Sequence, residues 1–207
     1  ALDEGLLKED LSAVADGLCN LEKQIENMRL FGVPVVVAVN EFTTDAPKEI
    51  ELVRQKAISF GADSCCVSRL WAEGAKGGEE LARAVIRAAN KPNNFKFLYP
   101  LDIPIKEKIE IIATKIYGCR EVQYSAVAEE KVTKYTNQGL DKLPICMAKT
   151  HLSLSHDPTL KGRPRDFVLP IRDIRASVGA GFLYPLCGEM RTMPGLPTEP
   201  AGEKIDI

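Results

Sequence analysis

The chain has 207 residues, of which 45% are hydrophobic and 27% are charged, and its formal net charge is −2 at pH 7. This composition is typical of a globular protein long enough for one core or two small ones. The slight negative charge argues against non-specific nucleic-acid binding, which requires a basic face. No run approaches the ~20 apolar residues of a membrane-spanning helix, so we expect no membrane partner.

The N-terminus, Ala1-Leu2-Asp3-Glu4, is neither a signal peptide nor a transit peptide. It lacks an initiator Met and passes directly into a helical pattern, so we expect the chain to be cut from something longer. The six cysteines include no C-x-x-C pair and are too sparse for a disulfide scaffold. We therefore expect a reduced, cytoplasmic compartment.

A helix followed by a buried strand opens the chain. Gly32 ends the helix, and the next run, Val33–Val39, is apolar at every position. Such a run is typical of a strand covered on both faces, as in a parallel sheet. Apolar residues recur at alternating steps of three and four in the predicted helix, at Leu11, Val14, Leu18, Leu21, Ile25 and Met28.

The alternation of helices and strands continues to about residue 94. Thr44 or Asp45 is expected to cap a second helix that has Pro47 in its first turn. A short strand near Ser64–Val67, a Gly-rich loop and a third helix follow. The expected apolar stripes are Ile50, Val53, Ala57 and Phe60 in the second helix, and Leu81, Val85, Ile86 and Ala89 in the third. We therefore predict an α/β domain over residues 1–94, with a doubly wound, mostly parallel sheet.

Residues 95–207 are punctuated by Pro and Gly, and we predict a smaller α+β domain there. Its expected helices are Ile105–Tyr117 and Val127–Asn137. Its expected strands are Phe95–Leu101, Ile145–Lys149, Phe167–Ile171 and Phe182–Leu186.

Two aromatic residues follow the two predicted parallel strands of the first domain. Phe42 comes just after Asn40, at the end of the first strand, and Trp71 follows the second. Ligands of open α/β sheets bind outside the carboxyl ends of the strands. A flat, partly polar heterocycle such as a pterin suits two stacking aromatics. The residues alone leave open that Phe42 lies in the core and that Trp71 covers a loop.

Phosphate and metal chemistry have little support. No G-x-x-x-x-G-K-[ST] loop exists anywhere in the sequence. The glycines of Gly74–Gly78 either form a small anion nest before a helix or make a plain tight turn. The only histidines, His151 and His156, have a spacing that fits neither one helix face nor a zinc pattern, so we expect no metal.

Residues Leu143–Pro197 contain several uncommon sequence segments in a fixed order. They include Leu-Pro-Ile-Cys-Met-Ala-Lys-Thr-His, Ser-Val-Gly-Ala-Gly-Phe and Met-Pro-Gly-Leu-Pro. This array closely resembles the C-terminal end of formate–tetrahydrofolate ligase (10-formyltetrahydrofolate synthetase). The resemblance covers essentially the whole chain, from the first helix through Ile116-Tyr117-Gly118 to Lys204–Ile207. The segment Lys-Thr-His-Leu-Ser-Leu-Ser-His resembles the eukaryotic, C1-tetrahydrofolate synthase form.

The resemblance assigns roles to particular side chains. It implies that Phe42 and Trp71 stack against the folate ring, with Asn40 and Lys149 as possible further substrate-binding residues. A surface role for Lys149 remains the alternative. Thr43 and Ala75 depart from the family pattern beside the two aromatics, which affects the expected pocket shape. No residue of this chain is assigned a catalytic role.

The resemblance also implies a reaction, in which ATP, formate and tetrahydrofolate give 10-formyltetrahydrofolate, ADP and phosphate. The phosphate loop of this P-loop-type ligase, with its ATP and magnesium, lies upstream of residue 1. We therefore expect the chain alone to be inactive, with the missing N-terminal portion as its partner and a homo-oligomer in the full enzyme. Two alternatives are a non-catalytic binding or assembly module and a self-sufficient ligase that binds phosphate at Gly74–Gly78.

Overall fold

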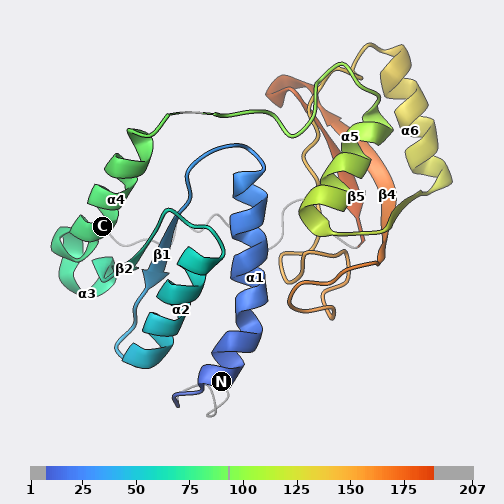
Figure 1. Ribbon diagram of the computed structural model, residues 1–207. Coiled ribbons are helices and arrows are strands. Elements are labelled where there is room, and N and C mark those ends of the chain that lie inside the picture. The colour runs from blue at the N-terminus through green and yellow to red at the C-terminus, as the bar shows by residue number, and fades with distance from the viewer. Residues whose placement is uncertain (1–7, 93, 189–207) are drawn as a thin grey trace, which may run out of the picture. The chain divides into compact units, whose positions relative to one another are not determined.

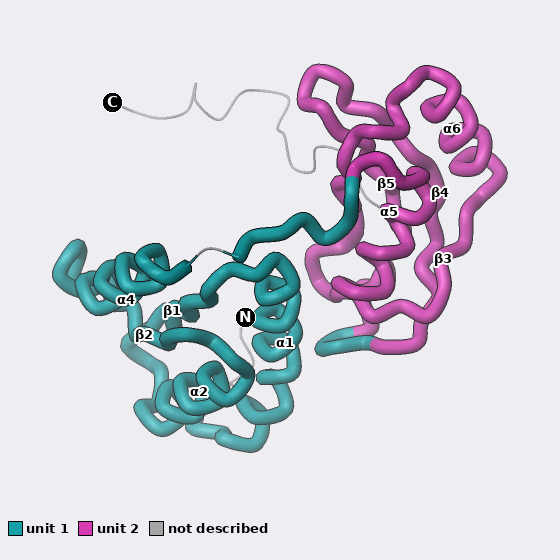
Figure 2. The backbone as a smooth tube through the Cα atoms, turned by 45° about the horizontal axis from the view of Figure 1, so that its top comes forward, with its two compact units in different colours: residues 1–100, 161–164 teal, residues 101–160, 165–207 magenta. Residues whose placement is uncertain are grey.

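The computed structural model describes residues 8–92 and 94–188 (Figure 1). The chain divides into two compact units, and each combines helices with a sheet of its own. Unit 1 holds Ala1–Pro100 and Lys161–Pro164, and unit 2 holds Leu101–Leu160 and Arg165–Ile207 (Figure 2). The expected mixed α/β class is thus confirmed. The stretches 193–197 and 204–207, which carry part of the family resemblance, lie outside the described residues.

Unit 1 alternates helices and strands in the predicted order. Its sheet consists of two parallel strands, with Val36 opposite Ser64 and Asn40 opposite Ser68. Its elements are α1 (Leu11–Arg29), β1 (Val36–Asn40), α2 (Pro47–Ser59), β2 (Ser64–Ser68), α3 (Leu70–Glu73), a 3₁₀ helix (Gly74–Gly78) and α4 (Glu79–Ala89).

The start of α2 differs from the prediction. Ala46 occupies the N-cap position and makes no side-chain capping bond. Because proline disfavours the helical conformation in the residue before it, Pro47 fixes Ala46 in extended backbone and the helix begins at Pro47. The carboxylate of Asp45 instead accepts the backbone N–H of Phe42 at 2.9 Å. The predicted cap at Thr44 or Asp45 is therefore wrong.

Helices lie on both faces of the two strands. Cys65 of β2 packs in one cluster with Ile25 of α1 and Ala57 of α2. The thiol of the next residue, Cys66, lies 3.9 Å from the carbonyl oxygen of Glu80 in α4. Since successive side chains of a strand point to opposite faces, α1 and α2 cover one face and α4 covers the other (Figure 2).

The expected complete burial of the first strand is wrong. Ala38 and Asn40 are exposed, although every residue from Val35 to Val39 is apolar. The stripe expected to be buried on α4 is also wrong, because the helix buries Ala84 while Val85 is 49% and Ile86 is 60% exposed. A sheet of two strands is too narrow to cover these apolar surfaces.

Residues 94–98 form no strand, which corrects the expectation at Phe95–Leu101. Lys96 donates its backbone N–H to the carbonyl of Phe31 at 3.0 Å. The rings of Phe95 and Phe97 contact each other edge to face at 5.2 Å. The alternation of aromatic and polar residues in this segment thus reflects a local ring contact, without a strand ladder.

Unit 2 contains a mixed sheet in the order β3-β4-β5, parallel between β3 and β4 and antiparallel between β4 and β5. Its elements are α5 (Ile105–Ile112), a π-helical turn (Ala113–Tyr117), β3 (Glu121–Tyr124), α6 (Ala126–Asn137), β4 (Val168–Ser177), a 3₁₀ turn (Val178–Ala180) and β5 (Phe182–Cys187). Both helices and the strands corresponding to β4 and β5 were predicted. The short β3 was not, because four residues carry too weak a pattern.

The strand expected at Ile145–Lys149 is wrong as a continuous element. Only two isolated bridges form there, from Ile145 to Leu183 and from Ala148 to Leu186. Pro144 precedes this segment, and its carbonyl accepts the N–H of Leu183 at 2.9 Å. The segment therefore lies along β5 without building a full ladder.

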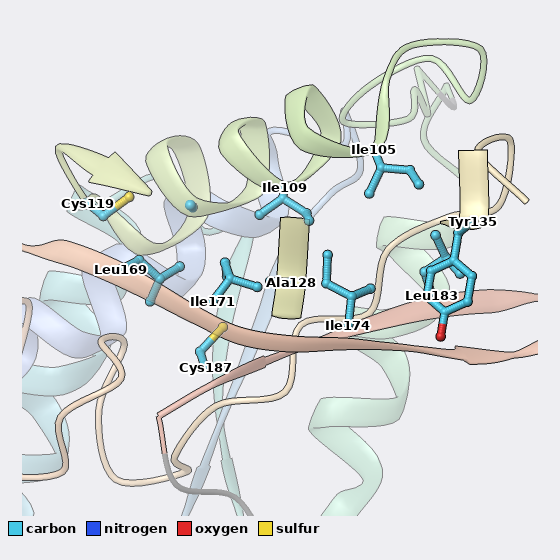
Figure 3. Close-up of a cluster of buried hydrophobic side chains, with 11 residues drawn as sticks. Ile105, Ile109, Cys119, Ala128, Tyr135, Leu169, Ile171, Ile174, Leu183 and Cys187 are labelled. Atoms are coloured by element: carbon cyan, nitrogen blue, oxygen red, sulfur yellow. The ribbon is translucent and has the colours of Figure 1, made fainter. Parts of the chain in front are cut away.

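The core of unit 2 is a cluster of buried side chains from its helices and its sheet (Figure 3). Leu169, Ile174 and Leu183 are each 0% exposed. Lys108 is also fully buried, and its ammonium group donates to the carbonyls of Asp141 at 2.5 Å and Leu143 at 3.1 Å. A buried cation with these carbonyl partners ties the loop after α6 to α5.

Candidate functional site

The two strands of unit 1 end side by side. Asn40 lies opposite Ser68, and the N–H of Glu41 donates to the carbonyl of Ser68 at 3.0 Å. Because β1 and β2 are parallel, their carboxyl ends meet at one edge of the sheet. This edge is where open α/β sheets bind ligands. The residues that follow each strand therefore define the candidate site.

Phe42 follows β1 in a tight turn. Its N–H donates to the carboxylate of Asp45 at 2.9 Å, and the N–H of Asp45 donates back to the carbonyl of Phe42 at 3.0 Å. The Phe42 side chain is 58% exposed. A large apolar ring held at the surface by a defined turn is available to contact a ligand. Phe42 is therefore not a core residue of the described part of unit 1.

Trp71 lies in α3, directly after β2. Its side chain is 81% exposed, and its neighbour Leu70 is 50% exposed. Trp71 and Phe42 thus follow adjacent strand ends at the same edge of the sheet, each with an exposed face.

The glycines after Trp71 let the backbone fold back tightly on β2. The N–H of Arg69 donates to the carbonyl of Gly77 at 3.0 Å. A Cβ atom at Gly77 would lie 2.4 Å from the backbone oxygen of Arg69, and one at Gly78 would lie 2.7 Å from Leu70. The predicted Gly-rich loop is in fact α3 and a 3₁₀ helix. This close approach explains the glycines without a phosphate.

An ion pair joins the two strand ends. The guanidinium group of Arg69 hydrogen-bonds the carboxylate of Glu41, and this bond raises the pKa of Arg69 above its ordinary value. The pair links Glu41, which precedes Phe42, to Arg69, which precedes Trp71 by two residues. Sequence reasoning missed it, although opposite charges directly after two neighbouring parallel strands were a usable signal.

Asn40 and Lys149 lie in different units. Asn40 is exposed at the end of β1, next to Glu41. The ammonium group of Lys149 donates to the carbonyls of Thr150, at 2.7 Å, and Ser153, and it lies 5.4 Å from the centre of the Tyr117 ring. Burial lowers the pKa of Lys149. These contacts use its charge to hold the loop at 149–153.

Within residues 8–92 and 94–188, no three His, Cys, Asp or Glu side chains are grouped so that they could hold a metal ion. His151 is exposed, and His156 packs against the ring of Phe167 at 6.3 Å between centroids. None of the helices in these same ranges combines the length and apolar character needed to cross a membrane.

Comparison with known proteins identifies relatives over the full chain. The family model for formate–tetrahydrofolate ligase matches residues 2–207. The chain is 53% identical over 206 residues to a formate–tetrahydrofolate ligase of Roseiflexus castenholzii, with 100% of this chain and 36% of the relative covered. It is 56% identical over 200 residues to the mitochondrial monofunctional C1-tetrahydrofolate synthase of Mus musculus, with 97% and 20% covered.

A third relative is the cytoplasmic C-1-tetrahydrofolate synthase of Homo sapiens, 54% identical over 206 residues, with 100% of this chain and 22% of the relative covered. The bacterial and animal relatives are thus about equally similar to this chain, so identity does not single out the eukaryotic form. The chain spans between 20% and 36% of the length of these relatives. Its match over residues 2–207 shows that the chain belongs to the formate–tetrahydrofolate ligase family.

Proposed function

We propose that this chain is the folate-binding C-terminal part of a formate–tetrahydrofolate ligase. The parent enzyme joins formate to tetrahydrofolate with ATP, giving 10-formyltetrahydrofolate, ADP and phosphate. The observation that carries the proposal is the pair of exposed aromatics, Phe42 and Trp71, after adjacent parallel strands in a member of this family.

In this proposal the two rings enclose the pterin of tetrahydrofolate between them. Stacking removes both faces of the heterocycle from water, and it suits a ligand with an apolar body and a polar edge. The polar edge would meet the charged groups of Glu41 and Arg69 and the amide of Asn40. Holding the pterin in this way places N10 for attack on an activated formyl group, so the chain contributes through orientation.

The phosphoryl step belongs to the rest of the parent enzyme. No P-loop sequence occurs in this chain, and the glycines of Gly74–Gly78 already serve the close backbone approach to Arg69 and Leu70. We propose that ATP and magnesium bind in the upstream portion. We further propose that the complete enzyme extends a doubly wound sheet and forms a homo-oligomer in the cytoplasm. For Lys149 we propose a role within unit 2, where it fixes the loop at 149–153.

A tetrahydrofolate titration followed by the fluorescence of Trp71 tests this proposal, because Trp71 is the only tryptophan. We expect saturable quenching whose affinity weakens about 5- to 150-fold for Phe42→Ala, because the loss of one stacking partner is worth about 1–3 kcal/mol on the scale of base–aromatic stacking. Phe97→Ala is the matched control, since Phe97 is an exposed ring of the same unit away from the strand ends.

Correction for ligand absorbance uses free tryptophan at the same concentrations. Absence of saturable quenching in the folded chain, or equal loss in Phe97→Ala and Phe42→Ala, would contradict the folate site and favour a non-catalytic assembly module. Formate-dependent ATP hydrolysis by the chain alone would contradict its dependence on an upstream portion.

A further inference from the structure

In the two strands of unit 1, the exposure of the residues differs from what their apolar or polar character predicts. β1 comes from the all-apolar run Val35–Val39, typical of a strand inside a sheet, yet Ala38 in its middle is exposed. β2 carries serine at both ends but buries Cys65 and Cys66. In a complete sheet, β1 would be the interior strand and β2 the edge strand.

The free edge of β2 is already protected by charged side chains. A cavity of about 500 Å³ lies along it, lined by Ser64, Cys65 and Cys66 and by polar residues of α2 and α4. Arg54 of α2 lies 3.9 Å from Glu80 of α4, so a weak ion pair spans the edge from one helix layer to the other. Charged side chains are a common protection of natural sheet edges against further strands.

No described strand pairs with the other edge of β1. The N–H of Asp63 donates to the carbonyl of Val35, so Val35 and the alternate residues after it direct their backbone groups toward β2. Val36 and Ala38 therefore direct theirs away from β2. Backbone N–H and C=O groups of this kind are normally hydrogen-bonded in folded proteins, so a further strand could pair with them.

The position of α1 indicates where the sheet continues. α1 leads directly into β1 and lies on the same face as α2 (Figure 2). Crossovers between parallel strands are right-handed in about 98% of cases, so two successive crossovers on one face step in the same direction across the sheet. A parallel strand before α1 must then lie on the side of β1 that faces away from β2.

The opposite face of the sheet is incomplete in the same place. Its described helix layer consists of α4, in which the carbonyl oxygen of Glu80 lies 3.9 Å from the thiol of Cys66 in β2. The Ala38 side chain, which points to that face of β1, is exposed. Val85 and Ile86 are also exposed, on a helix in which Ala84 is the buried residue. A helix from elsewhere would find apolar surface here.

We propose that the outer edge of β1 is the docking surface for the upstream portion of the ligase, which adds a parallel strand there beneath α1. The length of the relatives supplies this occupant, because the chain covers 36% of the Roseiflexus ligase and 22% of the human synthase. The inference rests on the proposed function, and it assigns the upstream portion of the ligase a binding site on this chain.

The test is co-expression of this chain with the tagged part of the Roseiflexus ligase that precedes the matched segment, followed by purification through the tag. Ala38→Pro removes the outward N–H of β1 while leaving the bonds to β2, and proline is tolerated on edge strands. We expect at least a tenfold loss of co-purified chain. The matched control is Val67→Pro in β2. The carbonyl of Ser68 accepts the N–H of Glu41, so Val67, the residue before Ser68, directs its own N–H to the other edge, and this variant should bind within twofold of the wild type.

Wild-type binding by Ala38→Pro, or an equal loss in Val67→Pro, would overturn the proposal. Circular dichroism of each variant alone checks that it is folded. Hydrogen exchange of the wild-type chain gives a reading that needs no variant: the amides of Val36 and Ala38 should exchange at least tenfold more slowly in the complex. Unchanged exchange there would overturn the proposal, as would the same protection in the chain alone with rising concentration, which would assign the edge to a second copy.

Formation of 10-formyltetrahydrofolate by the purified complex separates this inference from the proposed function. A complex that protects Val36 and Ala38 and makes no product supports the docking surface and contradicts the proposed function. Product formation without protection of these amides supports the function and contradicts the docking surface.

Discussion

Unit 2 buries its core with its own residues, whereas unit 1 leaves apolar side chains exposed and one edge of its sheet unpaired among the described residues. The sheet of unit 2 is covered by α5 and α6, and Leu169 and Ile174 on β4 are 0% exposed. The sheet of unit 1 has two strands, and Ala38 in the middle of β1 is exposed. Two-stranded sheets are marginal on their own in water. Unit 1 thus carries the proposed folate-binding residues on a sheet that its own described elements leave partly uncovered.

The largest effect should come from the closed core of unit 2. Ile174→Ala should lower the free energy of unfolding by about 2–5 kcal/mol, because it removes buried methylene groups and leaves a cavity. Ile86→Ala, the same change on the exposed stripe of α4, should alter it by less than about 0.5 kcal/mol. Urea unfolding followed by circular dichroism measures both. Comparable losses in the two variants would break the contrast between the units.

The next effect should come from the close backbone approach that holds Trp71. Gly77→Ala puts a Cβ atom 2.4 Å from the Arg69 carbonyl, so the backbone must shift, at a cost of about 1–3 kcal/mol. Because this shift displaces Trp71, the affinity measured from tetrahydrofolate quenching of Trp71 should also weaken. Gly17→Ala is the control, since its Cβ meets nothing within 4 Å and Gly17 lies in helix α1 without a positive φ. Equal weakening of quenching in both variants would contradict a special role for the approach at Gly77.

The smallest effect should be a pH dependence of unit 2. Burial raises the pKa of Cys187 to about 12. The folded state therefore favours the protonated thiol, so this stabilisation is complete below the ordinary thiol pKa and declines as pH rises from about 9 toward about 12. Between pH 8 and 10 the wild type should lose roughly 1 kcal/mol more than Cys187→Ala.

The exposed thiol of Cys146 supplies the control for that measurement. Cys146→Ala measures the effect of removing a thiol that is not buried. Identical slopes in wild type and Cys187→Ala would mean that the Cys187 site opens to water before the chain unfolds, and that unit 2 is less closed than its packing indicates.

Local signals in the sequence were sufficient for most elements. The three-and-four spacing of apolar residues predicted α1, and the continuous apolar run predicted β1. The segments after both strands were likewise expected to carry the site, because a strand is followed by its carboxyl-end loop in any parallel sheet. β3 escaped notice because four residues carry little periodicity, and the Phe95–Leu101 pattern misled because two aromatic rings contact each other locally.

The sequence by itself determined the family, the order of helices and strands in unit 1 and the two aromatics that follow its strands, because these depend on residue types and spacings along the chain. Tertiary structure decided which apolar residues are buried, since burial depends on how many strands and helices are present to cover them. It also decided that Glu41 pairs with Arg69 and that Lys149 holds its own loop. Such contacts join residues that only the folded backbone brings within hydrogen-bonding distance.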